Sequence, residues 1–316
     1  LDMGFAPQLN EILKFLPNFI FDLITLKAPP FIVSRITGLQ DKNGQDIEGV
    51  VIGIPMTAHQ LLEHRALASQ KVIQASKLAQ SKGASFIGLG AMTASLTRGG
   101  RDVIDNVKDV YVTTGRTYTT KNVSEYVDYS VEKFNLDKNK VKIAIVGAAG
   151  GIGSGTAIVL ARKGYKNFLL IDLERKLEHL KKRIEVIEKH ASDLSIEMSH
   201  QIARVSESHI IIAATSAPEV VLMPYDISPG TIIINDAQPP DVSPDIIRTR
   251  TDVLVIEGGV LTTPNINCHF NMGLAHKNDI FSCLAETLLL AHRDSKNHYS
   301  IDDFDPNLYQ ELYEDG

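Results

Sequence analysis

The chain has 316 residues, 44% of them hydrophobic, and this length suits two domains better than one. A net charge of −6, without basic runs interleaved with aromatic residues, argues against nucleic acid as a partner, and no apolar stretch approaches the roughly 18 residues of a membrane span. Only two cysteines occur, which argues against a disulfide framework and indicates a reducing, cytoplasmic setting.

The first part of the chain has the pattern of an α/β domain. Ile32 to Ile36, Gly49 to Ile54 and Ser85 to Leu89 are typical of strands. Met56 to Lys82 has the periodicity of one long amphipathic helix. The sequence therefore predicts a smaller α/β substrate domain over residues 1–121. The chain opens at Leu1 without a methionine, and we expect that one or both ends of the natural protein are missing; no signal peptide is visible.

A strand, a glycine turn and a helix follow one another in the middle of the chain. Val141 to Val146 is typical of a buried parallel strand, and Ser154 to Lys163 has helical periodicity. Glycines between them let the backbone turn sharply and approach a pyrophosphate, whose charge is met by the free N–H groups of the helix. We expect a dinucleotide to contact the residues of this turn, namely Gly147, Ala149, Gly150, Gly151, Ile152 and Gly153.

Asp172 indicates which dinucleotide binds. It closes a second predicted strand, Phe168 to Ile171. A carboxylate at this position accepts hydrogen bonds from the adenosine ribose and repels a 2′-phosphate. We therefore expect the cofactor to be NAD(P)H, with NAD preferred over NADP.

Three further apolar runs predict additional strands of a doubly wound parallel sheet of the Rossmann type. They are His209 to Ala214, Thr231 to Asn235 and Val253 to Ile256. Because ligands bind at the carboxyl ends of such strands, we expect cofactor contacts from the residues that follow them, Thr215, Ser216, Asp236 and Gly259. The nucleotide domain is placed at residues 122–278. Residues 279–316 are expected to form a helix and a tail that pack between the domains or on the first domain.

Cys283 is the candidate nucleophile. It lies within the first turns of a predicted helix in HKNDIFSCLAETLLLAH, where free N–H groups and the helix dipole stabilise a thiolate; the alternative is a small core residue. His276 is a candidate for proton transfer, although a surface histidine is the simpler interpretation. The hydroxyl-rich segment Thr113 to Thr120, which includes Thr117, is a candidate ligand-binding loop. No metal site is predicted, because no histidine, cysteine or carboxylate cluster has metal-ligand spacing.

Taken together, these segments resemble the cyanobacterial long-chain acyl-acyl carrier protein reductases and related predicted amino-acid dehydrogenases. The most specific segment is FSCLAETLLL at Phe281 to Leu290. The likeness covers most of the chain and includes KAPP at Lys27 to Pro30, GQDIEG at Gly44 to Gly49, LAQSKGASFIGLG at Leu78 to Gly90, TTGRTYTT, GAAGGIGS at Gly147 to Ser154, ATSAP at Ala214 to Pro218 and EGGV at Glu257 to Val260.

The resemblance implies a reaction. In that family the cysteine matching Cys283 takes the acyl group from a thioester, and the nicotinamide cofactor reduces the acyl-enzyme to an aldehyde. The substrate would then be an acyl thioester of acyl carrier protein or of coenzyme A, and hydroxyls such as that of Thr117 would stabilise the oxyanion. One difference is clear, since the family carries basic residues suited to NADP where this chain has IDLER with Asp172.

Two other functions stay open. One is direct hydride exchange with a small hydroxy or amino acid, with Cys283 merely packed. The other is a nucleotide-binding module without catalysis. The first domain also resembles shikimate dehydrogenases, but its turn IPMTAH at Ile54 to His59 lacks their catalytic lysine. Self-association into a homo-oligomer is left open as well.

Overall fold

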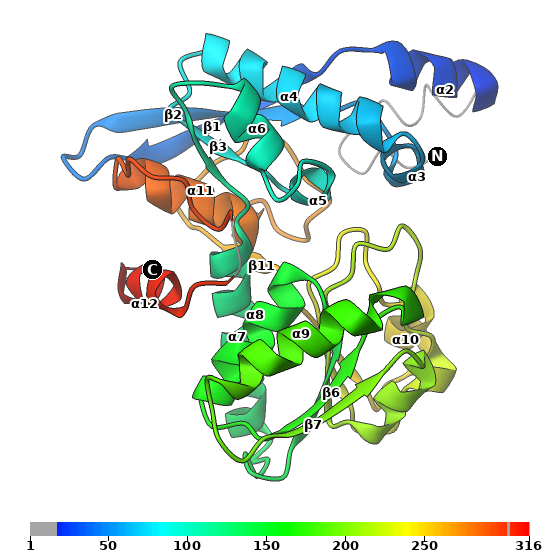
Figure 1. Cartoon of the computed structure of the whole chain (residues 1–316). Helices are drawn as coiled ribbons and strands as arrows, with labels where there is room; N and C mark the ends of the chain where they lie inside the picture. Colours follow the sequence, from blue (N-terminus) through cyan, green and yellow to red (C-terminus); the bar gives the residue numbers. More distant parts are fainter. Residues whose placement is uncertain (1–17, 302–303, 316) are drawn as a thin grey trace. The chain divides into compact units, whose positions relative to one another are not determined.

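The computed structural model describes residues 18–301 and 304–315, and its contacts divide the chain into two compact units (Figure 1). Unit 1 consists of Leu1–Gly115 and Leu261–Asp302, and unit 2 of Arg116–Val260 and Asp303–Gly316. The boundaries expected after residues 121 and 278 differ from these divisions. Helix α7 begins at Arg116, so it belongs to unit 2 as one continuous element, and the segment after Val260 returns to unit 1.

Unit 2 is built on a six-stranded parallel sheet in the order β10-β9-β8-β5-β6-β7. Its strands are β5 (Lys142–Val146), β6 (Asn167–Ile171), β7 (Ser195–Ser199), β8 (Ile210–Ala213), β9 (Ile232–Asn235) and β10 (Leu254–Glu257). The first three strands run outward from β5 on one side and the last three on the other, so the order reverses between β5 and β8. This is the strand order of the dinucleotide-binding fold, and the predicted Rossmann-type doubly wound sheet is confirmed.

The central strands of this sheet, β5, β6, β8 and β9, are buried on both faces. Ile143, Ile145 and Ile212 belong to one apolar cluster, while their neighbours along the strands, such as Ala144 and Ile211, belong to a second cluster. Burial on both faces explains why the strands are continuous apolar runs rather than alternating ones. The helical elements of unit 2 are α7 (Arg116–Lys133), α8 (Gly151–Arg162), η1 (Glu174–Lys176), α9 (Leu177–Glu188), η2 (Ile202–Glu207), η3 (Pro224–Asp226), α10 (Pro244–Thr249) and α12 (Pro306–Asp315).

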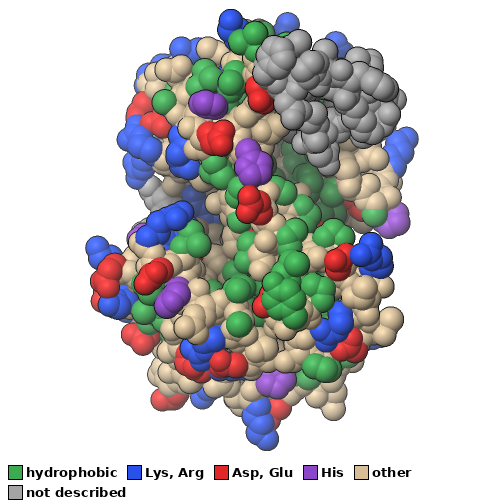
Figure 2. All heavy atoms as spheres, turned by 90° about the vertical axis from the view of Figure 1, so that its right-hand side faces the viewer, with side chains coloured by type: hydrophobic (Ala, Val, Ile, Leu, Met, Phe, Trp, Pro, Cys, Tyr) green, Lys and Arg blue, Asp and Glu red, His purple; other side chains and the backbone are tan. Residues whose placement is uncertain are grey.

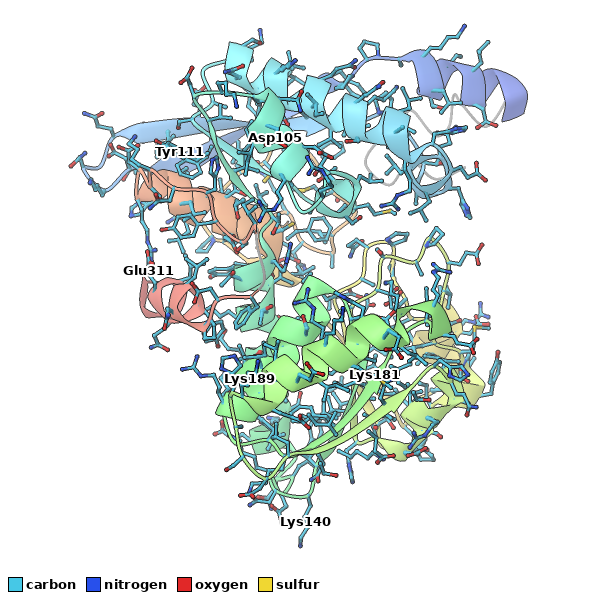
Figure 3. The ribbon with its side chains drawn as sticks, viewed as in Figure 1. Asp105, Tyr111, Lys140, Lys181, Lys189 and Glu311 are labelled. Atoms are coloured by element: carbon cyan, nitrogen blue, oxygen red, sulfur yellow. The ribbon has the colours of Figure 1, made fainter. Side chains whose placement is uncertain are left out.

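Helix α9 shows how the covering helices are oriented. Its Leu180 and Ile187 are fully buried in the first cluster. Lys181, on the same helix, is exposed, as is Lys189 just after its end, and both side chains point away from the unit (Figure 3). The helix is therefore amphipathic, with one apolar stripe on the sheet and charges toward solvent.

Unit 1 carries shorter sheets. The strands are β1 (Phe31–Gln40) antiparallel to β2 (Asp46–Gly53), β3 (Phe86–Gly88) parallel to β4 (Tyr111–Thr113), and β11 (Val260–Thr262) beside β12 (Asp279–Phe281). The helices are α2 (Asn18–Lys27), α3 (Ala58–Glu63), α4 (Arg65–Ser81), α5 (Thr93–Leu96), α6 (Arg101–Asn106) and α11 (Ser282–His292). The predicted α/β character of this part is thus observed.

The single helix predicted over Met56 to Lys82 is wrong, because the structure has two helices there. Thr57 starts α3 with a capping box, in which its hydroxyl accepts the Gln60 N–H and the Gln60 side chain accepts the Thr57 N–H. The break falls at His64, whose φ of −111° and ψ of 48° are not helical. Apolar periodicity alone therefore did not reveal the interruption.

Lys71 on α4 has a structural role. The side chain is 3% exposed, and its Nζ donates to the carbonyl oxygens of Thr25 (2.9 Å) and Ala28 (2.5 Å) at the end of α2. Burial lowers the pKa of Lys71. A cation at this place satisfies the last carbonyl groups of α2 and complements its dipole.

An apolar surface lies on unit 2 where η3 and α10 meet. Tyr225 is 81% exposed and Ile247 is 66% exposed. Figure 2 shows hydrophobic side chains gathered among charged ones on this face of the molecule. Such a patch is typical of contact surfaces, and homo-oligomer formation stays a prediction. None of the described helices is long and apolar enough to span a bilayer.

Candidate active site

The turn between β5 and α8 depends on glycine. Gly147 has a φ of +86°, and a Cβ there would lie 2.5 Å from the carbonyl oxygen of Ala214, which follows β8. At Gly153, a Cβ would lie 2.6 Å from the carbonyl oxygen of Gly147. A side chain would not fit at Gly147 or Gly153, so the backbone at the start of α8 is not covered by side chains from these two residues. This arrangement suits a phosphate that binds the N–H groups of a helix N-terminus.

Asp172 fastens this turn to the end of β6. The side chain is 7% exposed, and its Oδ2 accepts the N–H of Ala149 (2.9 Å). Its Oδ1 accepts the N–H of Leu173 (2.8 Å) and lies 3.4 Å from Nζ of Lys176. The structure thus brings together two residues that the sequence assigned to the cofactor, and it adds a neighbouring lysine that the sequence reasoning missed.

Four predicted cofactor residues follow the strands on the other side of β5. The N–H and the hydroxyl of Thr215 donate to the carboxyl group of Asp241 (3.0 and 2.5 Å), which is 0% exposed. Ser216 is exposed next to it. A Cβ at Gly259 would lie 2.5 Å from Oδ1 of Asp236, so these two residues are in contact. Asp241 was not found from sequence, since its role depends on the loop returning to Thr215.

Carboxyl groups accumulate at the ends of β9 and β10. Burial, and then the nearby charges of Asp241 and Glu257, raise the pKa of Asp236 to about 8. Burial also raises the pKa of Asp241, against the hydrogen bonds from Thr215. Among the described residues, no group of three or more His, Cys, Asp or Glu is placed to hold a metal ion. With a pKa of about 8, Asp236 is mostly protonated at neutral pH.

Asp236→Asn should stabilise the protein at alkaline pH. The folded pKa of about 8 exceeds the unfolded value of roughly 3.9, so wild-type stability falls as pH rises from about 4 to about 8. Asparagine does not titrate, and the variant should melt about 3–6 °C above wild type at pH 8.5 and by a smaller margin at pH 5. Calorimetry at both pH values measures this.

The control for that experiment is Asp252→Asn, because Arg250 lowers the pKa of Asp252. Asp252→Asn should therefore not raise the melting temperature at pH 8.5. Equal pH dependence of Asp236→Asn and wild type would contradict the raised pKa of Asp236.

Cys283 is the second residue of α11 and is half-buried in unit 1. A Cβ at Gly90, two residues after β3, would lie 3.6 Å from its Sγ. Gly115, two residues after β4, has a φ of +70°, and a Cβ there would lie 2.2 Å from Cα and 2.3 Å from Cβ of Cys283. The start of α11 and the carboxyl ends of the parallel strands β3 and β4 thus meet at the thiol. The other cysteine, Cys268, is 5% exposed, and burial raises its pKa.

A buried carboxyl group supports this arrangement. Glu286, one turn after Cys283, is 0% exposed, and its Oε1 accepts the hydroxyls of Thr113 and Ser300, the latter at 2.7 Å. The Thr113 hydroxyl oxygen accepts the N–H of Gly115 (3.2 Å). These bonds fix the loop that presses Gly115 against Cys283. Sequence reasoning missed Glu286; the available signal was that it is the one acidic residue of α11.

Thr117 and His276 are the other two predicted catalytic residues. Thr117 is 3% exposed in the first turn of α7, in unit 2. His276 is exposed in the turn before β12, where its backbone N–H donates to Oδ2 of Asp279 (3.2 Å). Their catalytic roles stay predictions.

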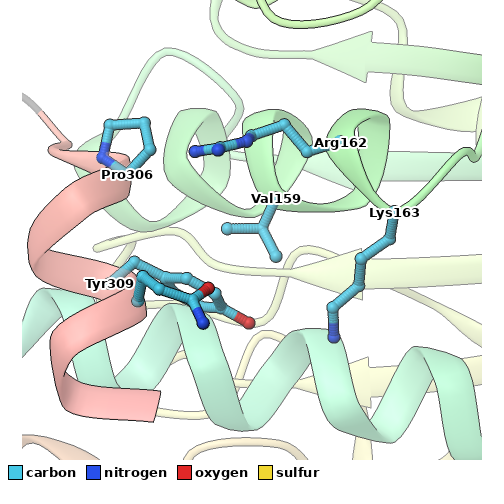
Figure 4. A pocket seen from close by; sticks show the side chains of 6 residues that line it. Val159, Arg162, Lys163, Pro306 and Tyr309 are labelled. Carbon is cyan, nitrogen blue, oxygen red and sulfur yellow. The ribbon is translucent and has the colours of Figure 1, made fainter. Parts of the chain in front are cut away.

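A shallow pocket of about 230 Å³ lies at the C-terminal end of α8 (Figure 4). Val159, Arg162 and Lys163 line it from α8 and the residue that follows the helix, and Pro306, Tyr309 and Gln310 line it from α12. Because the glycine turn is at the opposite end of α8, this pocket is not part of the expected phosphate site.

No family model matches the chain. The chain is similar to a long-chain acyl-[acyl-carrier-protein] reductase of Synechococcus elongatus, with 25% identity over 288 residues that cover 86% of this chain and 81% of that protein. It is also similar to the aminotransferase PigE of a Serratia species, with 27% identity over 266 residues, 82% of this chain. The chain spans only 30% of that protein. Among solved structures, the shikimate 5-dehydrogenase of Listeria monocytogenes in complex with shikimate and NAD has 16% identity and a TM-score of 0.35, covering 61% of this chain and 62% of that one.

Proposed function

We propose that the protein is an NAD(P)H-dependent oxidoreductase that reduces an acyl thioester to an aldehyde through an acyl-enzyme on Cys283. The observation that carries this proposal is the half-buried thiol at the start of α11, flanked by Gly90 and Gly115. Without a side chain at Gly90, no Cβ covers Sγ on that side, which favours an accessible thiol over a packed one. The distant similarity to an acyl-[acyl-carrier-protein] reductase supports the substrate class.

The first step uses the chain's own residues. The Cys283 thiolate attacks the thioester carbonyl carbon, the carrier leaves as a thiolate that takes up a proton, and a new thioester joins the acyl group to Sγ. The first-turn N–H groups of α11 stabilise the attacking thiolate. Glu286 and Thr113 hold the Gly115 backbone in place beside it. In this scheme Thr117 is a hydroxyl donor to the oxyanion and His276 exchanges the proton.

The cofactor site of the proposal is the carboxyl edge of the sheet in unit 2. The close approaches at Gly147 and Gly153 fit a group that needs bare backbone at a helix start. Asp172 would bind the adenosine ribose, and Thr215, Ser216, Asp236 and Gly259 would line the rest of the site. Bound NAD(P)H supplies the hydride that converts the acyl group to the aldehyde and frees the thiol.

Asp172→Asn should shift the cofactor preference toward NADPH. Asparagine keeps an oxygen that accepts the Ala149 N–H but removes the charge that repels a 2′-phosphate, and Lys176 is already 3.4 Å from the carboxyl group. The ratio of NADPH to NADH affinity, measured by fluorescence titration, should rise by about tenfold. Glu174→Gln, an exposed acid two residues later, is the control and should leave the ratio unchanged. An unchanged ratio in Asp172→Asn would rule out this role.

Acyl transfer is tested directly with palmitoyl thioesters of coenzyme A and of acyl carrier protein. Without cofactor, mass spectrometry should find one hydroxylamine-sensitive acyl adduct on Cys283. Adding NADH or NADPH should release the acyl group from Cys283 as the aldehyde. Absence of an adduct with short and long chains, in protein that binds NADH, would overturn the reductase proposal. Direct hydride exchange with a small hydroxy or amino acid would then be the better hypothesis. If the protein turned over neither acyl thioesters nor small hydroxy or amino acids, a non-catalytic nucleotide-binding module would be favoured.

A further inference from the structure

The turn formed by residues 90–92 follows β3 and lies beside the thiol of Cys283. A Cβ at Gly90 would lie 3.6 Å from Sγ, and a Cβ at Gly88 would lie 2.0 Å from Oγ1 of Thr287 on the same helix. Helix α11 therefore packs directly on the main chain of β3 and of this turn. All of these residues belong to unit 1. A group bonded to Sγ consequently has backbone atoms of the turn as close neighbours.

Three consecutive N–H groups of this turn have no hydrogen-bond acceptor within the described part of the chain, namely those of Gly90, Ala91 and Met92. The N–H groups on either side are bonded, because Leu89 donates to the carbonyl oxygen of Thr113 (2.8 Å) and Thr93 to that of Gly90 (3.2 Å). Met92 is 4% exposed, so water has little access to it. Backbone donors without a partner are rare at buried positions, and strain, a catalytic role or a bound species explains those that occur.

The backbone of the turn directs successive N–H groups to one side. Ala91 has a φ of +49°, in the left-handed region that residues with a side chain rarely adopt, and Met92 follows with a right-handed φ of −79° and ψ of −7°. Adjacent residues of opposite hand form a concave nest of N–H groups, which binds anionic oxygens. Thr93 holds this conformation, since its N–H and its hydroxyl both donate to the carbonyl oxygen of Gly90 (3.2 and 2.6 Å). An anion-binding turn thus lies next to the candidate nucleophile.

We propose that the N–H groups of residues 90–92 form the oxyanion hole for acyl transfer to Cys283. When the thiolate adds to the carbonyl carbon of the thioester, the π electron pair of the carbonyl moves onto its oxygen, which then carries the negative charge. When the carbonyl bond forms again, the carrier leaves as a thiolate. Fixed N–H donors stabilise the charged oxygen more than the neutral carbonyl, so they lower the barrier. This inference rests on the proposed function and assigns donors that belong to the same unit as the thiol.

The test replaces single amides of the turn by esters, which removes one N–H group and leaves every side chain unchanged. An ester between Ala91 and Met92 should slow formation of the palmitoyl adduct on Cys283 by about 10²-fold, as expected when one oxyanion donor is lost. An ester between Gly90 and Ala91 should have the same effect. Alkylation of Cys283 by iodoacetamide should stay within about threefold of wild type in both proteins, because displacement of iodide forms no oxyanion.

The matched control is an ester between Lys82 and Gly83, before the amino end of β3. Gly83 is also left-handed, with a φ of +85°, and its N–H donates to the carbonyl oxygen of Gln80 (2.9 Å). This ester should leave acyl transfer within about threefold of wild type. Wild-type rates of acyl transfer in both esters of the turn would overturn the inference. An equal fall of acyl transfer and alkylation would also overturn it, since the turn would then shape the thiol and not the oxyanion.

A second measurement uses the wild-type protein, and it decides the question if the ester variants do not fold. A long-chain trifluoromethyl ketone forms a tetrahedral adduct with a thiolate and reacts no further. The pKa of the adduct's hydroxyl, followed by fluorine NMR, should be lower on Cys283 than on a small thiol in water, because N–H donors stabilise the charged oxygen. An equal pKa would overturn the inference. Wild-type protein that takes up no acyl group at all would overturn the proposed function together with it, whereas a normal acyl adduct with an equal pKa overturns the oxyanion hole alone.

Discussion

Cys283→Ser should abolish the acyl-enzyme and lower aldehyde formation by at least about 10³-fold, the order of loss seen when a nucleophile is removed. The serine hydroxyl is similar in size but stays protonated at neutral pH, so the helix start has no thiolate to stabilise. Binding of NADH and the melting temperature should stay close to wild type, because the residue is half-buried and the change is small. Aldehyde trapping and intact-protein mass spectrometry measure the two losses.

Cys268→Ser is the control, since Cys268 is the other thiol and is 5% exposed. It should retain acyl transfer in whatever fraction of the protein stays folded. Iodoacetamide should accordingly label Cys283 well before Cys268. More than a tenth of wild-type turnover in Cys283→Ser would show that the thiol is only packed and would favour direct hydride exchange.

Gly115→Ala should damage both the fold of unit 1 and the thiol site. The position combines a φ of +70° with a Cβ only 2.2 Å from the main chain of Cys283, so neither strain nor clash is relieved by a side-chain rotation. We expect a loss of roughly 3 kcal/mol or more in the free energy of unfolding and a changed alkylation rate of Cys283 in the remaining folded protein.

Gly83→Ala separates the two causes. Gly83 has a φ of +85°, and a Cβ there meets nothing within 4 Å. This variant should cost about 1–2 kcal/mol from backbone strain alone and leave alkylation of Cys283 unchanged. If the two alanine variants unfold at the same denaturant concentration, the close contact between Gly115 and Cys283 contributes nothing.

The six-stranded sheet of unit 2 was largely predictable, because each strand is indicated by residues that are neighbours in the sequence. Ile143 and Ile145 lie in a continuous apolar run, which is what a strand buried on both faces requires. The edge strand β7 (SIEMS) was not predicted, because its burial alternates along the strand. Its exposed Glu197 forms ion pairs with Lys142 and Arg204. The fingerprint also placed Ala149 and Asp172 together, because their spacing follows from one strand-helix-strand unit.

The supporting groups of the site were not predictable in the same way. Glu286 acquires its role from Thr113 and Ser300, residues 173 and 14 positions away. Arg116 contacts Gly151 across two different helices. Neither relation leaves a period or a spacing in the sequence. The boundaries expected after residues 121 and 278 differ from the two compact units for a related reason, since polar linker composition does not indicate that a chain returns to its first unit.

Because the chain returns to unit 1 after Val260, unit 1 is completed late during synthesis on the ribosome. Every strand of the parallel sheet, through Glu257, emerges before α11 does. Unit 1, in contrast, lacks the helix that packs on β3 until residues near 292 have left the exit tunnel. Because domains fold as their segments become available, the sheet of unit 2 has all its strands while unit 1 is still incomplete. A nascent chain released early would therefore carry the glycine turn without α11 and its Cys283.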